Sequence, residues 1–278
     1  MPRALRITVL GSGTSHGVPA IGCDCDVCRS SDPRDRRTRP SILIEITPGP
    51  QDPDHTPDVA VTSAFAAGVR SILVDTSTDL RMQAITNDVR RVDAILFTHT
   101  HADHVFGIDD VRRFNQIQQA SIPCFGDADT LASLRRMFWY IFEPPTQVGG
   151  GLPRLTLFRL AGAFSLGGVE IVPVPLFHGR LPVLGFRIGS FAYLTDCNRI
   201  PEASFALLAG VRTLIIDALR HRPHSTHFSV SEATDVAARL GVGRAYLTHI
   251  SHDLGHATTC ASLPAGVELA YDGLVLDV

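Results

Sequence analysis

Short apolar runs and amphipathic stretches follow one another along most of the chain, separated by polar loops. Runs of roughly four to eight apolar or alternating residues predict strands, whereas apolar residues three or four positions apart predict helices. We expect strands at Leu5–Leu10, Ser41–Ile46, Ser71–Asp75, Asp93–Phe97, Leu155–Leu160, Val169–Leu176, Gly185–Ile188, Phe191–Leu194, Thr213–Ile216 and Arg244–Leu247. We expect helices at Leu80–Val89, Asp109–Ala120, Asp129–Phe142 and Ser229–Gly241.

The order of these elements indicates the fold class. Strands come first, helices and strands then alternate, and the arrangement repeats in the second half of the chain. This order favours two mixed sheets packed together with helices outside, an α/β or α+β architecture. With 278 residues, 45% of them hydrophobic, the chain can bury the core of one large domain or of two small ones. The proline-rich segment 47–56 is expected to be a solvated excursion in a hairpin.

Charge and hydropathy argue against some classes of protein. The formal net charge is −3 and the charged residues are scattered, which argues against a broad nucleic-acid-binding surface. The apolar part of the N-terminus is too short for a signal peptide, and no apolar stretch approaches the length of a transmembrane helix. We therefore expect a cytoplasmic protein.

The densest chemical signal is the sequence Thr98-His99-Thr100-His101-Ala102-Asp103-His104, which directly follows an apolar run. Three histidines and an aspartate within six residues offer the side chains that bind zinc, manganese, iron or nickel. His99 and His101 lie two apart in an extended segment and turn to one side. Asp103 and His104 follow a turn and face a second point, so this loop is predicted to serve two metals.

Other ligand-type residues also stand at the downstream ends of apolar strands, where they collect on one rim of the sheets. We assign His99, His101 and His178 to one metal, and Asp103, His104 and His249 to the other. Asp196 is expected to bridge both with its two oxygens. Asp75 is either an acceptor that orients a ligating histidine or a turn-forming aspartate.

The chemistry expected of this site follows from its charge. Two divalent ions, two carboxylates and a bridging hydroxide leave one net positive charge, which suits an anionic substrate. Water on such a metal loses its proton near pH ~7, which makes hydroxide available as the nucleophile. Hydrolysis of a phosphoester is the reaction that this arrangement favours.

Three of the six cysteines are crowded into the sequence Cys23-Asp24-Cys25-Asp26-Val27-Cys28. An odd, tightly spaced trio suits a metal better than a set of disulfides. We predict a tetrahedral zinc on a loop over residues 22–28, with a fourth ligand from elsewhere in the chain.

The set His99, His101, Asp103, His104, His178, Asp196 and His249 resembles the metallo-β-lactamase fold superfamily over nearly the whole chain. A closer likeness rests on the Gly11–Ser15 and Gly22–Cys28 segments, His101–Asp110, Thr226–Ser229 and Thr248–His252. These motifs together resemble the cyclic phosphodiesterases of the phosphonate-degradation (carbon–phosphorus lyase) pathway, which open 5-phosphoribosyl 1,2-cyclic phosphate.

The resemblance implies a single αββα sandwich over residues 1–278, two active-site metals and a homodimer. It also implies that His252 is the fourth ligand of the structural zinc. In the reaction, Asp103 and His227 are the residues expected to be catalytic, His227 as the proton donor to the leaving oxygen. His224 and His256 are candidates for substrate contacts, although a solvated role for His224 is the stronger alternative.

Two other functions stay open. A tRNA 3′-processing nuclease shares the bridging aspartate, but it carries an RNA-binding arm between the positions of His178 and Asp196. Only eighteen positions separate these residues here, which leaves no room for such an arm. A non-catalytic carrier role in cofactor biosynthesis is expected of chains with degenerate ligands, whereas every ligand position is filled in this sequence. A general phosphodiesterase would have the same pattern.

Overall fold

The computed structural model describes residues 4–47, 70–143 and 151–278. Except for Thr47, the segment 47–56 that was expected to be a solvated excursion lies outside these ranges. None of the helices in the described ranges combines the length and the apolar character needed to cross a bilayer.

Two seven-stranded sheets form the centre of the molecule. The first has the order β14-β1-β2-β3-β4-β5-β6 and the second the order β13-β12-β11-β10-β9-β8-β7. The strands of the first sheet are β1 (Leu5–Gly11), β2 (Ser41–Ile46), β3 (Ser71–Val74), β4 (Ala94–Leu96), β5 (Ile122–Gly126), β6 (Leu155–Arg159) and β14 (Val275–Asp277). Those of the second are β7 (Phe164–Leu166), β8 (Val169–His178), β9 (Leu181–Ile188), β10 (Phe191–Leu194), β11 (Thr213–Asp217), β12 (Arg244–Thr248) and β13 (Val267–Leu269).

Both sheets are mixed. In the first, β1, β2 and β3 pair in antiparallel fashion, whereas β3, β4, β5 and β6 are parallel. In the second, β8, β9 and β10 are antiparallel, whereas β10 to β13 are parallel. The parallel strands of each sheet end at the same edge, where the residues that follow them can meet.

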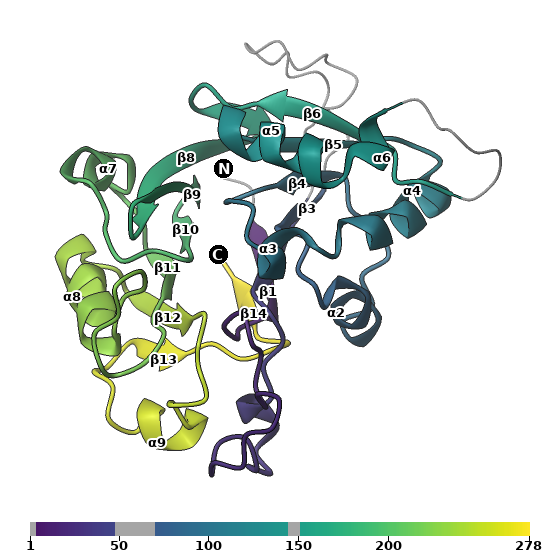
Figure 1. The fold of residues 1–278 in the computed structure, drawn as a ribbon. Helices are drawn as coiled ribbons and strands as arrows, with labels where there is room; N and C mark the ends of the chain where they lie inside the picture. Colours follow the sequence, from purple (N-terminus) through teal and green to yellow (C-terminus); the bar gives the residue numbers. More distant parts are fainter. Residues whose placement is uncertain (1–3, 48–69, 144–150) are drawn as a thin grey trace.

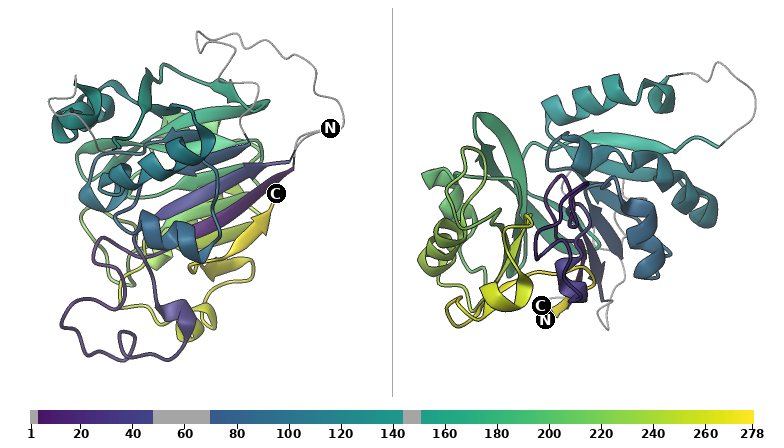
Figure 2. Two further views of the ribbon diagram at one scale, coloured as in Figure 1. Left: turned by 90° about the vertical axis from the view of Figure 1, so that its right-hand side faces the viewer. Right: turned by 60° about the horizontal axis from the view of Figure 1, so that its bottom comes forward.

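Helices cover the outer faces of both sheets (Figures 1 and 2). The helices of the described residues are η1 (Pro33–Asp35), α2 (Leu80–Thr86), α3 (Ala102–Val105), η2 (Ile108–Val111), α4 (Arg112–Gln118), α5 (Ala128–Met137), α6 (Trp139–Phe142), α7 (Glu202–Leu207), α8 (Val230–Leu240) and α9 (His256–Cys260). Of these, α2, α4 and α5 lie on the first sheet, and α7 and α8 on the second. The predicted αββα sandwich is confirmed.

Three apolar clusters match these four layers. The central cluster joins the facing sides of the sheets, with residues such as Ile72 and Leu96 opposite Phe186 and Ile215. The other two lie between each sheet and its helices. Burial on both faces explains why the parallel strands are continuous apolar runs in the sequence.

Two expectations about elements are corrected. The single helix predicted over Asp129–Phe142 is interrupted at Phe138, whose backbone (φ −115°, ψ 41°) leaves the helical region between α5 and α6. Strand β5 was not predicted, because Pro123 within its short run argues against a central strand. The helix predicted over Ser229–Gly241 is confirmed as α8, which begins at a capping box of Ser229 and Glu232 and ends at Gly241 in a left-handed conformation.

Candidate metal centre

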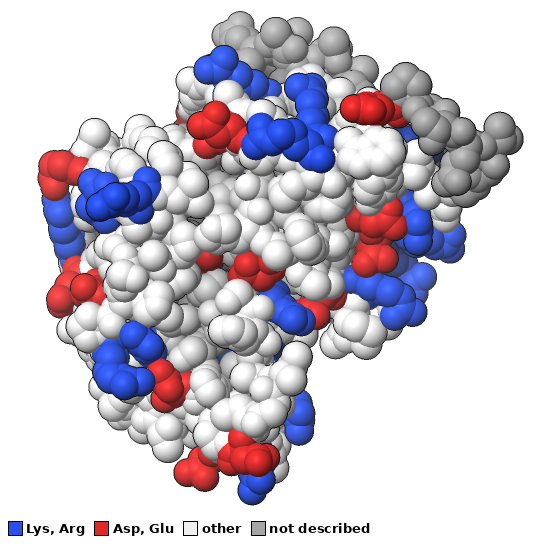
Figure 3. All heavy atoms as spheres, viewed as in Figure 1, with Lys and Arg blue, Asp and Glu red and all other residues white. Residues whose placement is uncertain are grey.

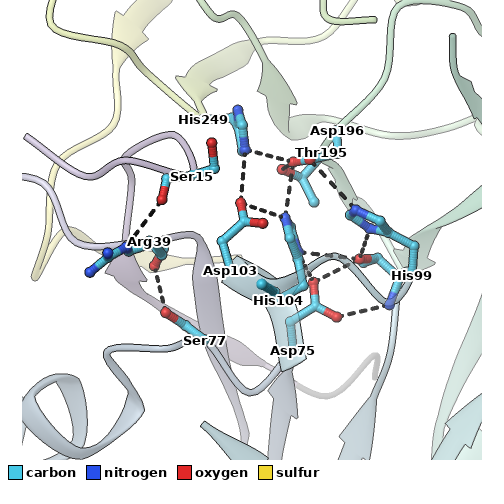
Figure 4. A network of polar contacts seen from close by, with 12 residues as sticks. Ser15, Arg39, Asp75, Ser77, His99, Asp103, His104, Thr195, Asp196 and His249 are labelled. Carbon is cyan, nitrogen blue, oxygen red and sulfur yellow. Dashed lines mark hydrogen bonds and ion pairs between the residues drawn. The ribbon is translucent and has the colours of Figure 1, made fainter. Parts of the chain in front are cut away.

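The ligand-type residues predicted at strand ends meet at one edge of the sandwich (Figure 4). The first sheet contributes Asp75 after β3 and the His99–His104 loop after β4. The second sheet contributes His178 at the end of β8, together with Asp196 after β10 and His249 after β12. Donors from the two sheets therefore face one another across the gap between their edges.

One group of donors surrounds a first point. Asp103, His104, Asp196 and His249 are all buried, and their ligand atoms lie within 4.8 Å of one another. The Oδ1 atom of Asp196 is 3.0 Å from Nε2 of His249 and 3.2 Å from Nε2 of His104. The Oδ2 atom of Asp103 is 3.5 Å from each of these nitrogens. Two carboxylates and two imidazoles thus converge as a metal site requires.

A second group lies on the other side of Asp196. His99, His101 and Asp196 also hold their ligand atoms within 4.8 Å of one another, and Nε2 of His99 is 3.7 Å from the Oδ2 atom of Asp196. His178 stands beside this group, with its ring centroid 5.1 Å from that of His101. The two oxygens of Asp196 therefore face two different clusters of histidines (Figure 4).

Hydrogen bonds to their other ring nitrogens orient two of the histidines. Nδ1 of His104 is 2.7 Å from the buried Oδ2 atom of Asp75, which also accepts from the hydroxyl of Thr98. Nδ1 of His178 donates to the carbonyl of Thr226 at 2.9 Å. Both contacts leave Nε2 free for a ligand, as is usual for metal-binding histidines. Of the two roles considered for Asp75, its contact with His104 supports that of orienting acceptor.

Several buried polar atoms of the site have no hydrogen-bond partner among the described residues, as is expected of atoms that bind a metal. Within the described part of the chain, Nε2 of His99, of His104 and of His249 is buried without a hydrogen-bond partner, as is the Oδ2 atom of Asp103. Buried polar groups are rarely left unpaired, because each one costs free energy. These atoms point into the two clusters, so divalent cations there would satisfy them together.

Burial keeps two of the imidazoles in the neutral form that binds metals. Burial lowers the pKa of His99, and it lowers the pKa of His178 to about 4. Burial alone would raise the pKa of Asp103, but its contacts with His104 and His249 outweigh this effect and hold it below its ordinary value. At neutral pH the two histidines are neutral and Asp103 is ionised, which are the forms that bind metals.

The backbone is strained at three residues of the site. Among the described residues other than glycine, only five have positive φ, and Asp75 (62°), Asp196 (51°) and His249 (59°) are three of them. Left-handed conformations are unfavourable for side chains with a Cβ and concentrate at functional sites. Each of these residues lies within two positions of the end of a strand, so the strained turn directs its side chain toward the edge where the donors meet.

His227 lies beside the first cluster. Its ring stacks on that of His249 at 4.6 Å, and its Nδ1 atom is 2.7 Å from the Oδ2 atom of Asp217. Asp217 is fully buried at the end of β11, and it was not predicted as a site residue. Its position at the end of a parallel strand is the same signal that identified Asp196. The contact leaves Nε2 of His227 free, and burial lowers the pKa of this imidazole.

The cysteine trio meets His252 at a separate site. The Sγ atoms of Cys23, Cys25 and Cys28 lie 3.1, 3.5 and 3.5 Å from Nδ1 of His252. The backbone N–H of Cys28 donates to the sulfur of Cys25 and lowers the pKa of that thiol to about 7. Burial raises the pKa of Cys28 to about 11. Three thiols and one imidazole are a donor set for tetrahedral zinc, which would hold these thiols as thiolates.

Comparison with known proteins gives the family of the chain. A model of the beta-lactamase superfamily domain matches residues 70–250. The chain belongs to the beta-lactamase superfamily. The crystal structure of a diphosphatase from the PhnP family shares 42% sequence identity with it at a TM-score of 0.84, covering 99% of this chain and 97% of that one.

Two relatives that are similar to this chain in sequence are named for different activities. An octanoyltransferase of Porphyromonas gingivalis is 35% identical over 272 residues, 97% of this chain, but the chain spans only 51% of that protein. A ribonuclease Z of Mycobacterium sp. (strain KMS) is 26% identical over 243 residues, which are 74% of this chain and 85% of that protein. Family, fold and donors together identify a metal-dependent hydrolase that binds divalent metal.

The two candidate substrate contacts lie in different places in this hydrolase. His224 is half-buried, with its ring 5.2 Å from that of His227, so it lies at the border of the site. His256 packs its ring against Tyr271, and its Nε2 atom is 3.8 Å from the sulfur of Cys260. The described contacts of His256 are with the C-terminal segment and the N-terminal loop, and this placement does not support a role in substrate binding.

A buried arginine, not singled out in the sequence, joins the two metal sites. Arg37 is 2% exposed, and its guanidinium donates to the carbonyls of Ser251 (3.1 Å) and Leu254 (2.8 Å). It also pairs with Asp35 at 2.9 Å. The two carbonyls belong to Ser251 and Leu254, which lie on either side of His252 in the sequence. The turn over residues 251–254 begins two residues after His249. Arg37 therefore holds the segment that supplies a ligand to each site.

Proposed function

We propose that the chain is a two-metal phosphodiesterase that hydrolyses a small anionic phosphodiester, of the type of 5-phosphoribosyl 1,2-cyclic phosphate or a nucleotide. The observation that supports this most is Asp196, whose two oxygens face two separate clusters of imidazoles. Manganese, zinc, nickel or iron suits these donors, and the cysteine site suits a structural zinc.

When bound, the active-site metals would polarise a phosphoryl oxygen and lower the pKa of a water. The side chains perform the remaining steps. In its doubly protonated form, His227 donates the Nε2 proton to the departing oxygen and becomes neutral, while the contact of Nδ1 with Asp217 keeps Nε2 directed into the site. Asp217 fixes the orientation of the ring and would stabilise the imidazolium before it loses this proton. Asp103 places a negative charge next to His104 and His249, which keeps both rings directed toward the first cluster.

Processing of tRNA is less well supported. The residues between His178 and Asp196 are occupied by a tight turn and by strands β9 and β10, which leaves no additional arm. Figure 3 shows basic and acidic side chains scattered over one face of the molecule and not gathered into a basic band. A small substrate agrees better with both observations. The homodimer, the cytoplasmic location and the link to phosphonate degradation stay predictions.

A second candidate substrate is a small diphosphate, because the PhnP-family structure that is 42% identical is described as a diphosphatase. Both substrates require attack of an oxygen nucleophile on phosphorus, so the same side chains serve either reaction. A carrier role is less favoured, since the donors of both clusters are present and converge.

The test compares wild-type protein with Asp196→Asn on bis(p-nitrophenyl) phosphate, loaded with manganese, nickel or zinc. Asparagine tolerates the left-handed backbone at this position, so the change removes charge without adding strain. We expect kcat/KM to fall by at least ~100-fold and the bound metal per chain to decrease. Asp88→Asn is a matched control, because Asp88 also has positive φ (51°) but lies on the surface.

Unchanged activity in Asp196→Asn, or no phosphodiesterase activity in wild-type protein shown to hold two ions in the site, would overturn the proposal. If the diester is inert but a diphosphate is cleaved, the second substrate is the correct one.

A further inference from the structure

An aromatic surface begins two residues after the metal ligand His104. The side chain of Phe106 is 55% exposed, although it follows directly on α3, which carries Asp103 and His104. Trp139 at the start of α6 is 50% exposed. Phe138 links these two residues. Its ring meets that of Phe106 edge-on, with the ring centroids 5.9 Å apart, and it directly precedes Trp139 in the chain. We call Phe106, Phe138 and Trp139 the aromatic ledge.

Phe106 directly follows the short helix that carries two of the metal donors, Asp103 and His104. Side chains of a helix lean toward its N-terminus, so a residue covers the turn before it. The turn before Phe106 contains Ala102, whose carbonyl accepts from the N–H of Phe106. Ala102 is exposed, and it is adjacent to the exposed ligand His101. By this rule the ring of Phe106 covers the N-terminal end of α3, where the metal donors begin.

The ledge is held in place by the fold. Phe138 is half-buried and packs against the apolar cluster between the first sheet and its helices. Next to Trp139, the hydroxyl of Tyr140 donates to Asp109 at 3.2 Å, which joins α6 to η2. Asp109 is in turn paired with Arg112 at 2.8 Å. Exposed aromatic rings with anchored neighbours lose little conformational freedom when they bind a ligand.

We propose that the aromatic ledge binds the base of a nucleotide whose phosphate lies at the metal centre, so that the substrate of the proposed hydrolase is a nucleotide derivative and not a bare sugar phosphate. This inference rests on the proposed function for the position of the phosphate. Aromatic side chains stack on any base, because every base has a π face. Beside the ledge, Asp109 is already paired with Arg112, so this ion pair offers no free cation to a second phosphate and agrees with an uncharged base.

Trp139 allows a direct test that does not depend on turnover. It is the single tryptophan of the chain, so intrinsic fluorescence reports on the ledge. Thymidine 5′-monophosphate is titrated into zinc-loaded protein, with ribose 5-phosphate as the ligand that lacks a base. We expect a saturable change in emission with the nucleotide and none with the sugar phosphate, and we expect apparent affinity for the nucleotide to fall ~10-fold in Phe106→Ala.

Two further variants separate stacking from a structural effect. Phe106→Tyr keeps an aromatic ring and should restore nucleotide affinity. Ile85→Ala removes a side chain of similar exposure (58%) from α2 and should leave affinity unchanged. No saturable change in wild-type protein, or equal affinities of wild-type protein and Phe106→Ala, would show that the ledge binds no base.

Kinetics then distinguish this inference from the proposed function. The p-nitrophenyl ester of thymidine 5′-monophosphate and methyl p-nitrophenyl phosphate release the same product, but only the first carries a base. In wild-type protein the thymidine ester should have the lower KM, and Phe106→Ala should raise that KM ~10-fold with kcat nearly unchanged. Hydrolysis of both esters with no preference for thymidine would refute the ledge alone. Saturable nucleotide binding without hydrolysis of either ester would refute the phosphodiesterase and retain the ledge.

Discussion

Replacing Arg37 by methionine should destabilise the protein strongly. The guanidinium is enclosed, with none of its side chain exposed, and Asp35 beside it is 8% exposed. Methionine fills much of the same space, so the change removes hydrogen bonds and charge while it opens little cavity. It leaves the carbonyls of Ser251 and Leu254 and the carboxylate of Asp35 without the donor that they share.

The magnitude follows from these contacts. Removing one partner of a buried ion pair costs about 3–5 kcal/mol, because the other charge stays buried without compensation. Asp35 keeps one donor, the backbone N–H of His256 at 2.7 Å, which favours the lower end of this range. The two orphaned carbonyls add to the loss. A domain is typically stable by only about 5–15 kcal/mol, so the expected change is a large share of the total.

The assay is urea unfolding followed by circular dichroism, with zinc held at a fixed excess for all variants. Arg34→Met is the control, because Arg34 makes an exposed pair with Asp32 and its loss should change stability little. A loss of less than ~1 kcal/mol in Arg37→Met would contradict the assignment of Arg37 as the residue that fixes the Ser251–Leu254 turn.

Three further predictions concern the zinc loop, pH and a close contact. Cys25→Ser should lower the zinc content by one ion per chain in elemental analysis, whereas Cys260→Ser, outside the donor set, should not. Burial lowers the pKa of His178 to about 4, below its ordinary 6.5, so the unfolded chain takes up the proton first as the pH falls. Stability of the metal-free protein should therefore be complete above pH ~6.5 and decrease toward pH ~4, and His178→Gln should reduce this slope in unfolding measured at several pH values. A slope unchanged in His178→Gln would assign it to other groups. Gly107→Ala should destabilise by about 1–3 kcal/mol, because its Cβ would lie 2.0 Å from the carbonyl of Ser77, and Gly162→Ala, which meets nothing within 4 Å, should be tolerated.

The sequence predicted the architecture and the donors because both depend on local patterns. The parallel strands are apolar runs that each end in a chemically distinctive residue, so strand ends and ligand candidates coincide, as at Asp196 and His249. The His99–His104 loop is contiguous, and its spacing alone indicates a metal. Short elements such as α3 and β13 were missed because they contain too few residues to repeat a helical or strand pattern.

Contacts between segments that are distant in the chain could not be predicted from the sequence. Arg37 looks like a surface arginine until the fold brings residues 251–254 around it, more than 200 positions away. The contact between Asp217 and His227 depends on a loop that returns to the end of β11. Left-handed backbone at Asp196 and His249 is set by how the sheets end, since neither residue is a glycine.

Because the donors are divided between the two sheets, metal binding should depend on the folding of both. The first sheet supplies the His99–His104 loop, and the second supplies His178, Asp196 and His249. An ion held by both groups is a cross-link that forms only after both halves have folded and met. Its release breaks contacts to both sheets, so the rate of metal release should depend on the ligands of both and not on any one of them. Amide hydrogens at the ends of β4 and β10 would accordingly exchange more slowly once the ion is bound.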